Sequence, residues 1–171
     1  MMKLLFFHQL PEVNNMASSV SIQEEVFEIG FETEELLNNK LGQMEDIGAI
    51  VTFTGRVRGK EKRTKINALE LQHYPGMTEK EIFKIVEKAE KRWSIKKARV
   101  IHRVGKLLPG ELIVFVGVLS SHRKAAFYSC SFIMDYLKIQ APFWKKEYTE
   151  TGHRWVESRA EDYLAADTWK N

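Results

Sequence analysis

The sequence lacks the features that mark secreted and membrane proteins. Its 171 residues include one cysteine, which excludes an internal disulfide framework and is typical of a reducing compartment. The longest apolar run, residues 112–119 with Gly117 counted, is far shorter than the ~20 residues of a membrane-spanning helix. The apolar stretch near the amino terminus is too short for a signal peptide, and no small-residue cleavage site follows it. We therefore expect a cytoplasmic protein without membrane contact.

Charge and composition describe an ordinary globular chain. The 26 basic and 23 acidic residues leave a net charge of +3, which does not call for a nucleic-acid partner. The hydrophobic fraction of 44% can fill a core, and this length suits one domain. No repeat, linker or low-complexity segment divides the chain. We expect one domain at residues 21–171, preceded by an N-terminal extension at residues 1–20.

Several catalytic signatures are also missing. No two of the five histidines have a metal-ligand spacing. His102 lies within an expected strand, and we expect it to have a structural role. The basic loop at residues 58–65 lacks the spacing of a P-loop, and there is no dinucleotide-binding fingerprint. There is no carboxylate pair or serine–histidine couple, and Cys130 is expected in the core. The sequence therefore predicts neither a metal site nor a cofactor.

Apolar periodicity predicts an alternation of strands and helices. Helices are expected at residues 32–41, 78–93 and 121–141, with a helical or frayed tail from residue 160. Thr78 is the expected N-cap of the second helix, with Glu81 completing a capping box. Strands are expected at residues 4–7, 25–29, 47–57, 66–74, 98–104, 111–120, 143–148 and 154–157. This order predicts a single α+β domain with mixed and antiparallel sheets and two main helices.

The third predicted helix is the most informative element. Ser121 is its expected N-cap, and Pro142 disfavours helix in the residue before it. At about 100° per residue one face of this helix is apolar and is expected to be core: Ala126, Cys130, Ile133, Met134 and Leu137. Lys138 lies at the edge of that face. It either binds an anion in a pocket or only extends its aliphatic stem over apolar surface.

Basic residues gather at the ends of these elements. His122 and Arg123 occupy the first turn of the helix, where cations are normally unfavourable, so their presence indicates a bound anion. Arg58 follows a strand end, whereas the lysines and arginine after it are expected to be solvated. Together with Lys138 and Lys145 these residues predict a site for a phosphate-bearing anion, with the attacking group supplied from elsewhere.

Six segments, in order, resemble the large, catalytic subunit of molybdopterin synthase. They extend from residue 48 to residue 157 and so cover nearly the whole expected domain. The segments are GAIVTFTGRVRG (48–59), LELQHYPGMTEK (69–80), VIHRVGKLLPGE (100–111), IVFVGVLSSHRKAAF (113–127), FIMDYLKIQAPFWKKE (132–147) and HRWVE (153–157). The resemblance implies a hammerhead-like α/β arrangement for residues 21–171.

The resemblance also implies an activity and a partner. Such enzymes are sulfurtransferases that convert cyclic pyranopterin monophosphate to molybdopterin, and no cofactor is implied. The sulfur arrives as a thiocarboxylate on the C-terminus of a small ubiquitin-like subunit, in a heterotetramer built on a homodimer of the catalytic subunit. Lys138 and Lys145 match the catalytic lysines. The residues that match substrate-binding positions are Arg56, Val57, Arg58, His122, Arg123, Lys138, Lys145, Lys146 and Glu147.

The spacing of two of these residues predicts a shared site. His122 and Lys138 are sixteen residues apart on one predicted helix, which separates them by ~24 Å and turns them ~160° apart. One pterin phosphate cannot touch both, so we expect His122 and Arg123 of one subunit to meet Lys138 and Lys145 of its twin.

Two other functions stay open. The basic loop permits a non-catalytic phosphate- or RNA-binding module, which would bind RNA with a steep salt dependence and transfer no sulfur. The chain could also be a scaffold that docks the ubiquitin-like partner and tolerates loss of Lys138.

Overall fold

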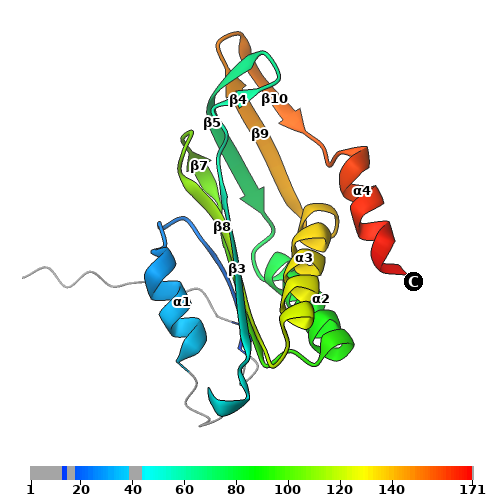
Figure 1. Cartoon of the computed structure of the whole chain (residues 1–171). Helices are drawn as coiled ribbons and strands as arrows, with labels where there is room; N and C mark the ends of the chain where they lie inside the picture. Colours follow the sequence, from blue (N-terminus) through cyan, green and yellow to red (C-terminus); the bar gives the residue numbers. More distant parts are fainter. Residues whose placement is uncertain (1–12, 15–17, 39–43, 171) are drawn as a thin grey trace, which may run out of the picture.

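Two β-sheets and two long helices form the body of the protein, shown as a computed structural model in Figure 1. The structure describes residues 13–14, 18–38 and 44–170. The first sheet contains, in order, β1 (Val13–Asn14), β2 (Ser19–Gln23), β6 (Lys97–Arg103), β8 (Leu112–Ser120) and β3 (Ala49–Arg56). The second contains β10 (Gly152–Val156), β9 (Phe143–Thr149), β5 (Thr64–His73) and β4 (Lys60–Glu61), with β7 (Gly105–Leu107) also paired to β5. The predicted α+β class is confirmed.

Strand β8 is an interior strand of the first sheet. It pairs antiparallel with β6 on one side and with β3 on the other. Val114 and Val116 belong to the main core cluster, whereas Phe115 packs with Phe27 and Ile101 in a separate cluster. Successive side chains of a strand point to opposite faces, so both faces of this sheet are covered. That double burial explains the unbroken apolar run.

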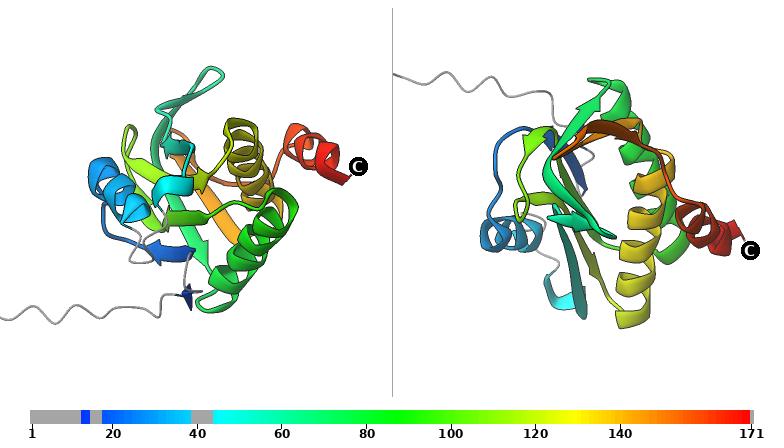
Figure 2. Two further views of the ribbon diagram at one scale, coloured as in Figure 1. Left: turned by 60° about the horizontal axis from the view of Figure 1, so that its bottom comes forward. Right: turned by 90° about the horizontal axis from the view of Figure 1, so that it is seen from above.

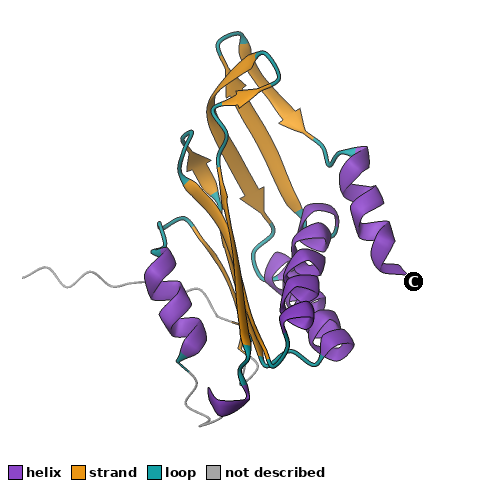
Figure 3. Ribbon diagram, in the orientation of Figure 1, coloured by secondary structure: helices purple, strands orange, loops and turns teal. Residues whose placement is uncertain are grey.

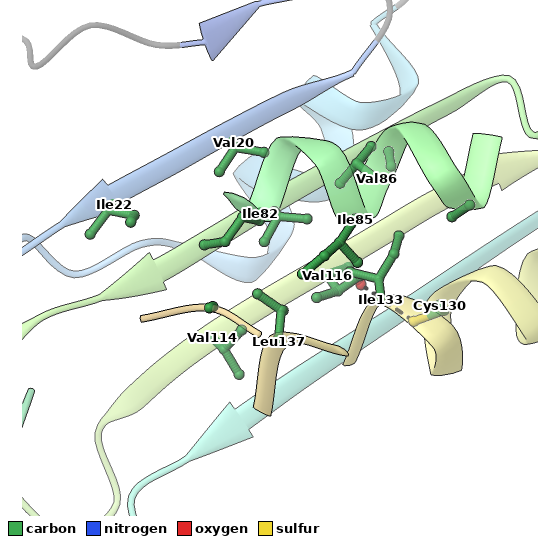
Figure 4. Packing of buried hydrophobic residues seen from close by; sticks show 14 of the residues in the cluster. Val20, Ile22, Ile82, Ile85, Val86, Val114, Val116, Cys130, Ile133 and Leu137 are labelled. Atoms are coloured by element: carbon green, nitrogen blue, oxygen red, sulfur yellow. Dashed lines mark hydrogen bonds between the residues drawn. The ribbon is translucent and has the colours of Figure 1, made fainter. Parts of the chain in front are cut away.

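The helices α2 (Met77–Trp93) and α3 (Arg123–Ile139) lie side by side on one face of the first sheet (Figure 2). In Figure 4 the helices pack onto Val114 and Val116 of β8 through their facing apolar residues: Ile82, Ile85, Val86, Cys130, Ile133 and Leu137. Burying each large aliphatic side chain contributes about 1.5–3 kcal/mol. The apolar faces predicted for both helices are confirmed, with Met134 only partly buried.

Helix α1 (Ile29–Leu37) covers the opposite face of the first sheet. Leu36 is fully buried there above Gly117. A Cβ on Gly117 would lie 2.7 Å from Cδ2 of Leu36, so glycine is required for this close approach. A short 3-10 turn, η1 (Met44–Asp46), precedes β3.

The C-terminal segment packs back along α3. It consists of α4 (Ala160–Asp167) and the 3-10 turn η2 (Thr168–Lys170), visible beside α3 in Figure 3. The Trp169 ring meets Trp93 edge to face, with centroids 5.5 Å apart, and its Nε1 donates to Asp135 at 2.8 Å. This aromatic contact anchors the chain end and keeps α4 next to α3.

Two secondary-structure predictions near the amino terminus differ from the structure. The predicted strand at residues 25–29 is wrong, because the strand is Ser19–Gln23 and α1 begins at Ile29, three residues earlier than predicted. The strand contains only Val20 and Ile22 as apolar residues, with Ser21 between them, and this short period-2 signal resembles a polar loop. Ser19 and Val20, the last residues of the expected extension, belong to the sheet. The predicted strand at residues 4–7 lies outside the described residues.

Both predicted helix caps are also displaced. The N-cap of α3 is His122 rather than Ser121. The N-cap of α2 is Gly76, whose N–H donates to the Glu79 carboxylate at 2.7 Å, so the capping box lies two residues before the predicted one. Gly76 has a φ of 80°, which favours glycine, and the tight turn before it starts the helix early.

Candidate active site

A cavity of about 470 Å³ lies where β3, β9 and the last turn of α3 meet the C-terminal segment. Six of the predicted site residues line it: Arg56, Val57, Arg58, Lys138, Lys145 and Glu147. The first three come from the end of β3 and the residues after it, Lys138 from α3, and the last two from alternate positions of β9. The fold thus gathers residues that are far apart in the sequence.

The two lysines lie on this cavity in different surroundings. The Lys138 side chain is 50% exposed, and its Nζ donates a hydrogen bond to Oδ1 of Asp162 at 2.9 Å. Lys145 is half-buried, and this burial lowers its pKa. Asp162 raises that pKa and Lys138 lowers it, with the net shift downward. Lys145 therefore loses its proton more easily than an exposed lysine.

Arg56 and Arg58 approach from the end of β3. The pairing register between β3 and β8 shifts at Gly55/Arg56, and such irregularities redirect the side chains that follow. The Arg56 Nε donates to the carbonyl oxygen of Gly110 at 2.7 Å, which fixes the guanidinium. Arg58 is 68% exposed and pairs with Glu61 at 2.9 Å. Exposed pairs contribute only about 0–1 kcal/mol, so an incoming anion can recruit Arg58 at little cost.

Carboxylates balance part of this positive charge. Glu147 accepts hydrogen bonds from Arg154, the shorter at 2.7 Å. Asp162 accepts from Lys138 and from the backbone N–H of Arg159, the latter at 3.0 Å. Burial raises the pKa of Asp162, but the hydrogen bonds and the two lysines outweigh it, so that the pKa is lowered overall. A charged Asp162 therefore occupies the place where an anionic ligand would meet Lys138.

The other three predicted residues lie away from the cavity. Helix α3 is continuous, as predicted, so His122 at its N-cap and the adjacent Arg123 lie ~24 Å from Lys138 along its axis. Lys146 alternates with Lys145 along β9, and its Nζ lies 5.5 Å from the Tyr148 ring centroid and 5.3 Å from that of Trp155. A cavity built from one chain therefore brings together six of the nine residues.

The cavity lining also includes residues that were absent from the predicted site, among them His102 and Asp162. His102 shares a face of β6 with Val100, a periodicity that would have placed it beside the helices. Asp162 lies in a tail whose sequence gives no sign of the cavity, because its position depends on how α4 packs.

Cys130 is confirmed as a core residue. It is 4% exposed, and burial raises its pKa to about 11, which makes it unreactive as a thiolate. Within the described ranges no three His, Cys, Asp or Glu side chains form a group able to hold a metal ion. None of the helices in the same ranges is long and apolar enough to cross a membrane.

Fold and cavity together define an α+β protein with a cavity lined by several lysines and arginines, while its one thiol lies in the core. The model of the MoaE protein family matches residues 22–140, and the chain belongs to this family.

Relatives of known function are molybdopterin synthase catalytic subunits. The one from Yersinia pestis is 56% identical over 129 residues, which are 75% of this chain and 85% of the relative. The one from Vibrio cholerae serotype O1 is 48% identical over 155 residues, 91% of this chain and all of the relative. The solved molybdopterin cofactor biosynthesis protein E from Burkholderia multivorans superposes with a TM-score of 0.75 at 44% identity, covering 92% of this chain and 99% of that one. The resemblance of the six segments is confirmed.

Proposed function

We infer that this chain is the catalytic subunit of a molybdopterin synthase and transfers sulfur in molybdenum cofactor biosynthesis. The observation that carries this function is the convergence of Lys138, Lys145, Arg56 and Arg58 on one cavity, with Cys130 buried elsewhere. Such a cavity suits an anionic substrate and requires that the sulfur be brought by another molecule.

The proposed substrate is cyclic pyranopterin monophosphate, which becomes molybdopterin when two sulfurs are installed as a dithiolene. Arg56 and Arg58 would hold the phosphate, because guanidinium groups bind phosphate oxygens in pairs. The ammonium groups of Lys138 and Lys145 would stabilise the negative charge that develops as each sulfur bonds to carbon. Charged donors fixed in such a site are typically worth about 10²- to 10³-fold in rate.

The sulfur donor is proposed to enter through a second hollow of about 510 Å³, which shares Lys138 and Lys145 with the cavity. Trp144 and Trp155 line this hollow and are each about half exposed. We propose that the C-terminal tail of a small ubiquitin-like subunit lies here and presents a thiocarboxylate to the lysines. A Helicobacter pylori protein–protein complex of subunits 1 and 2 of molybdopterin-converting factor has the same fold, with a TM-score of 0.65 at 21% identity, which supports a small partner.

A homodimer of the chain is proposed to complete the site, within a heterotetramer that includes two small subunits. The length of α3 supports this, because His122 and Arg123 cannot reach the cavity of their own chain. A two-fold axis would bring them to the twin's cavity and form two sites at once. The single cysteine supports a cytoplasmic location.

The deciding experiment is molybdopterin formation from cyclic pyranopterin monophosphate, purified chain and thiocarboxylated partner, followed by mass spectrometry. We expect turnover that requires all three components. A chain that binds RNA with a steep salt dependence and forms no product would be a phosphate- or RNA-binding module instead. A chain that binds the partner but works equally well without Lys138 would be a docking scaffold.

A further inference from the structure

His102 is a buried titratable residue on the cavity, and none of the roles above uses it. It is 8% exposed, in β6, and its ring stacks on Phe143 with centroids 4.1 Å apart and planes 22° from parallel. Phe143 and Lys145 are two residues apart in β9 and therefore lie on the same face of that strand. The stacking thus places His102 beside the backbone end of the Lys145 side chain.

The tautomer of His102 follows from one hydrogen bond. Its Nδ1 lies 2.8 Å from the carbonyl oxygen of Arg103, and a carbonyl can only accept, so Nδ1 carries the hydrogen. The pKa of His102 is lowered to about 4, mainly by burial; the backbone hydrogen bond to Arg103 raises it, whereas the charges of Lys145 and His73 lower it. The ring is therefore neutral at physiological pH, and its Nε2 is a hydrogen-bond acceptor.

Lys145 lines the same cavity as His102. Burial lowers the pKa of Lys145, Asp162 raises it and Lys138 lowers it. The other charged or titratable groups that line the same cavity come from α3, α4, β3, β4, β6, β9 and the segments between them: Lys138, Glu161, Asp162, Arg56, Lys60, Glu61, His102, Glu147, Arg58, Glu157 and Arg159. Its cross-strand neighbours, Leu71 of β5 and Val156 of β10, carry no charge. Asp162 is already engaged by Lys138 and by the Arg159 N–H, and Glu147 by Arg154.

We propose that His102 is a positioning residue for Lys145: its Nε2 accepts a hydrogen bond from the Lys145 ammonium and holds this side chain, still charged, against the cavity wall. The flexible four-carbon stem of lysine otherwise leaves its ammonium free to turn. The inference rests on the proposed role of Lys145 in sulfur transfer.

Three variants of the full chain test the pair. His102→Phe keeps a flat ring that can stack on Phe143 but has no acceptor, and His102→Gln keeps an acceptor. His73→Phe is the matched control, because it removes a neighbouring, largely buried imidazole that does not line the cavity. In each variant the rate of Lys145 acylation by acetic anhydride is measured against pH by peptide mass spectrometry. Melting temperature, kcat and KM are measured on the same preparations.

We expect His102→Phe to move the titration of Lys145 to lower pH, because the ammonium loses a stabilising partner. Its acylation at neutral pH should rise roughly tenfold, the scale of one hydrogen bond to a charged group. The kcat should fall while KM changes little, His102→Gln should recover part of both effects, and His73→Phe should match the wild type.

An unchanged Lys145 titration in folded His102→Phe protein would overturn the proposal. A rise in KM alone would also overturn it, since His102 would then contact the substrate itself. If His102→Phe does not fold, His102→Leu decides in the same way. Full activity of Lys145→Ala would reject the proposed role of Lys145, yet the acylation result would still report on the pair.

Discussion

Lys138 donates a hydrogen bond to Asp162 over 2.9 Å, across 24 residues of sequence. One partner ends α3 and the other lies in the first turn of α4, so this contact closes one side of the cavity. An anion that binds Lys138 must therefore compete with a carboxylate of the same chain.

Lys138→Ala should lower the rate of dithiolene formation by about 10²- to 10³-fold or more, because it removes a fixed charge from the cavity. The fold should stay intact, since the Lys138 side chain is half exposed. Lys145→Ala should be impaired as well, and Lys80→Ala, at an exposed position of α2, is the control. Product formation and melting temperature measure both effects, and near-normal turnover of Lys138→Ala would refute the assignment.

Mixed dimers test the shared site. His122→Ala/Arg123→Ala protein and Lys138→Ala protein should each be inactive alone. After subunit exchange they should regain part of the activity, because one of the two sites in a mixed dimer is then fully wild type. Activity is compared before and after exchange verified by native mass spectrometry. Absence of recovery, or a monomer at assay concentration, would contradict the shared site.

Cys130→Ala should keep full activity and lose roughly 1 kcal/mol of stability, the scale of a small core truncation. The thiol is buried, its pKa is raised to about 11, and its sulfur lies 3.9 Å from the carbonyl oxygen of Val116. Urea unfolding and turnover measure the two effects. Lost activity at an unchanged melting temperature would instead point to a sulfur relay through this residue.

His102 should make the protein sensitive to mild acid. Its pKa is about 4 in the folded protein and 6.5 ordinarily, so between these values the unfolded chain binds more protons. The free energy of unfolding should therefore fall as pH drops from about 6.5 toward about 4, by up to about 3 kcal/mol in total. His102→Phe should flatten this part of the curve, which is measured by urea unfolding at several pH values. Parallel curves for wild type and His102→Phe would rule out the effect.

Secondary structure could be predicted from the sequence where burial produces a long pattern of apolar residues. Ile82 and Val86 repeat at helical spacing in α2, and the run through Val116 marks an interior strand. The prediction fails at Val20 and Ile22, because two apolar residues in a five-residue strand give too little signal.

Some residues of the cavity could be predicted from the sequence, and others could not. Lys138 could be singled out because it borders the apolar face of a predicted helix, and the resemblance added Lys145 and the residues near Arg58. Asp162 could not, since α4 reaches the cavity through tertiary contacts, such as the packing of Trp169 against α2 and α3, that the local sequence does not indicate.

The parallel pair of β2 and β6 has a consequence for the order of folding. Ser19 pairs with Arg99, and the Ser18 hydroxyl accepts from the Ala98 N–H at 2.7 Å, across 80 residues of sequence. Closing so long a loop is entropically unfavourable until much of the intervening chain is ordered. During synthesis β2 leaves the ribosome well before its partner exists, whereas β6 and β8 can pair soon after both have emerged. Strand β2 is thus made early and yet is among the last to join the sheet, and until then one edge of β6 stays open to other strands.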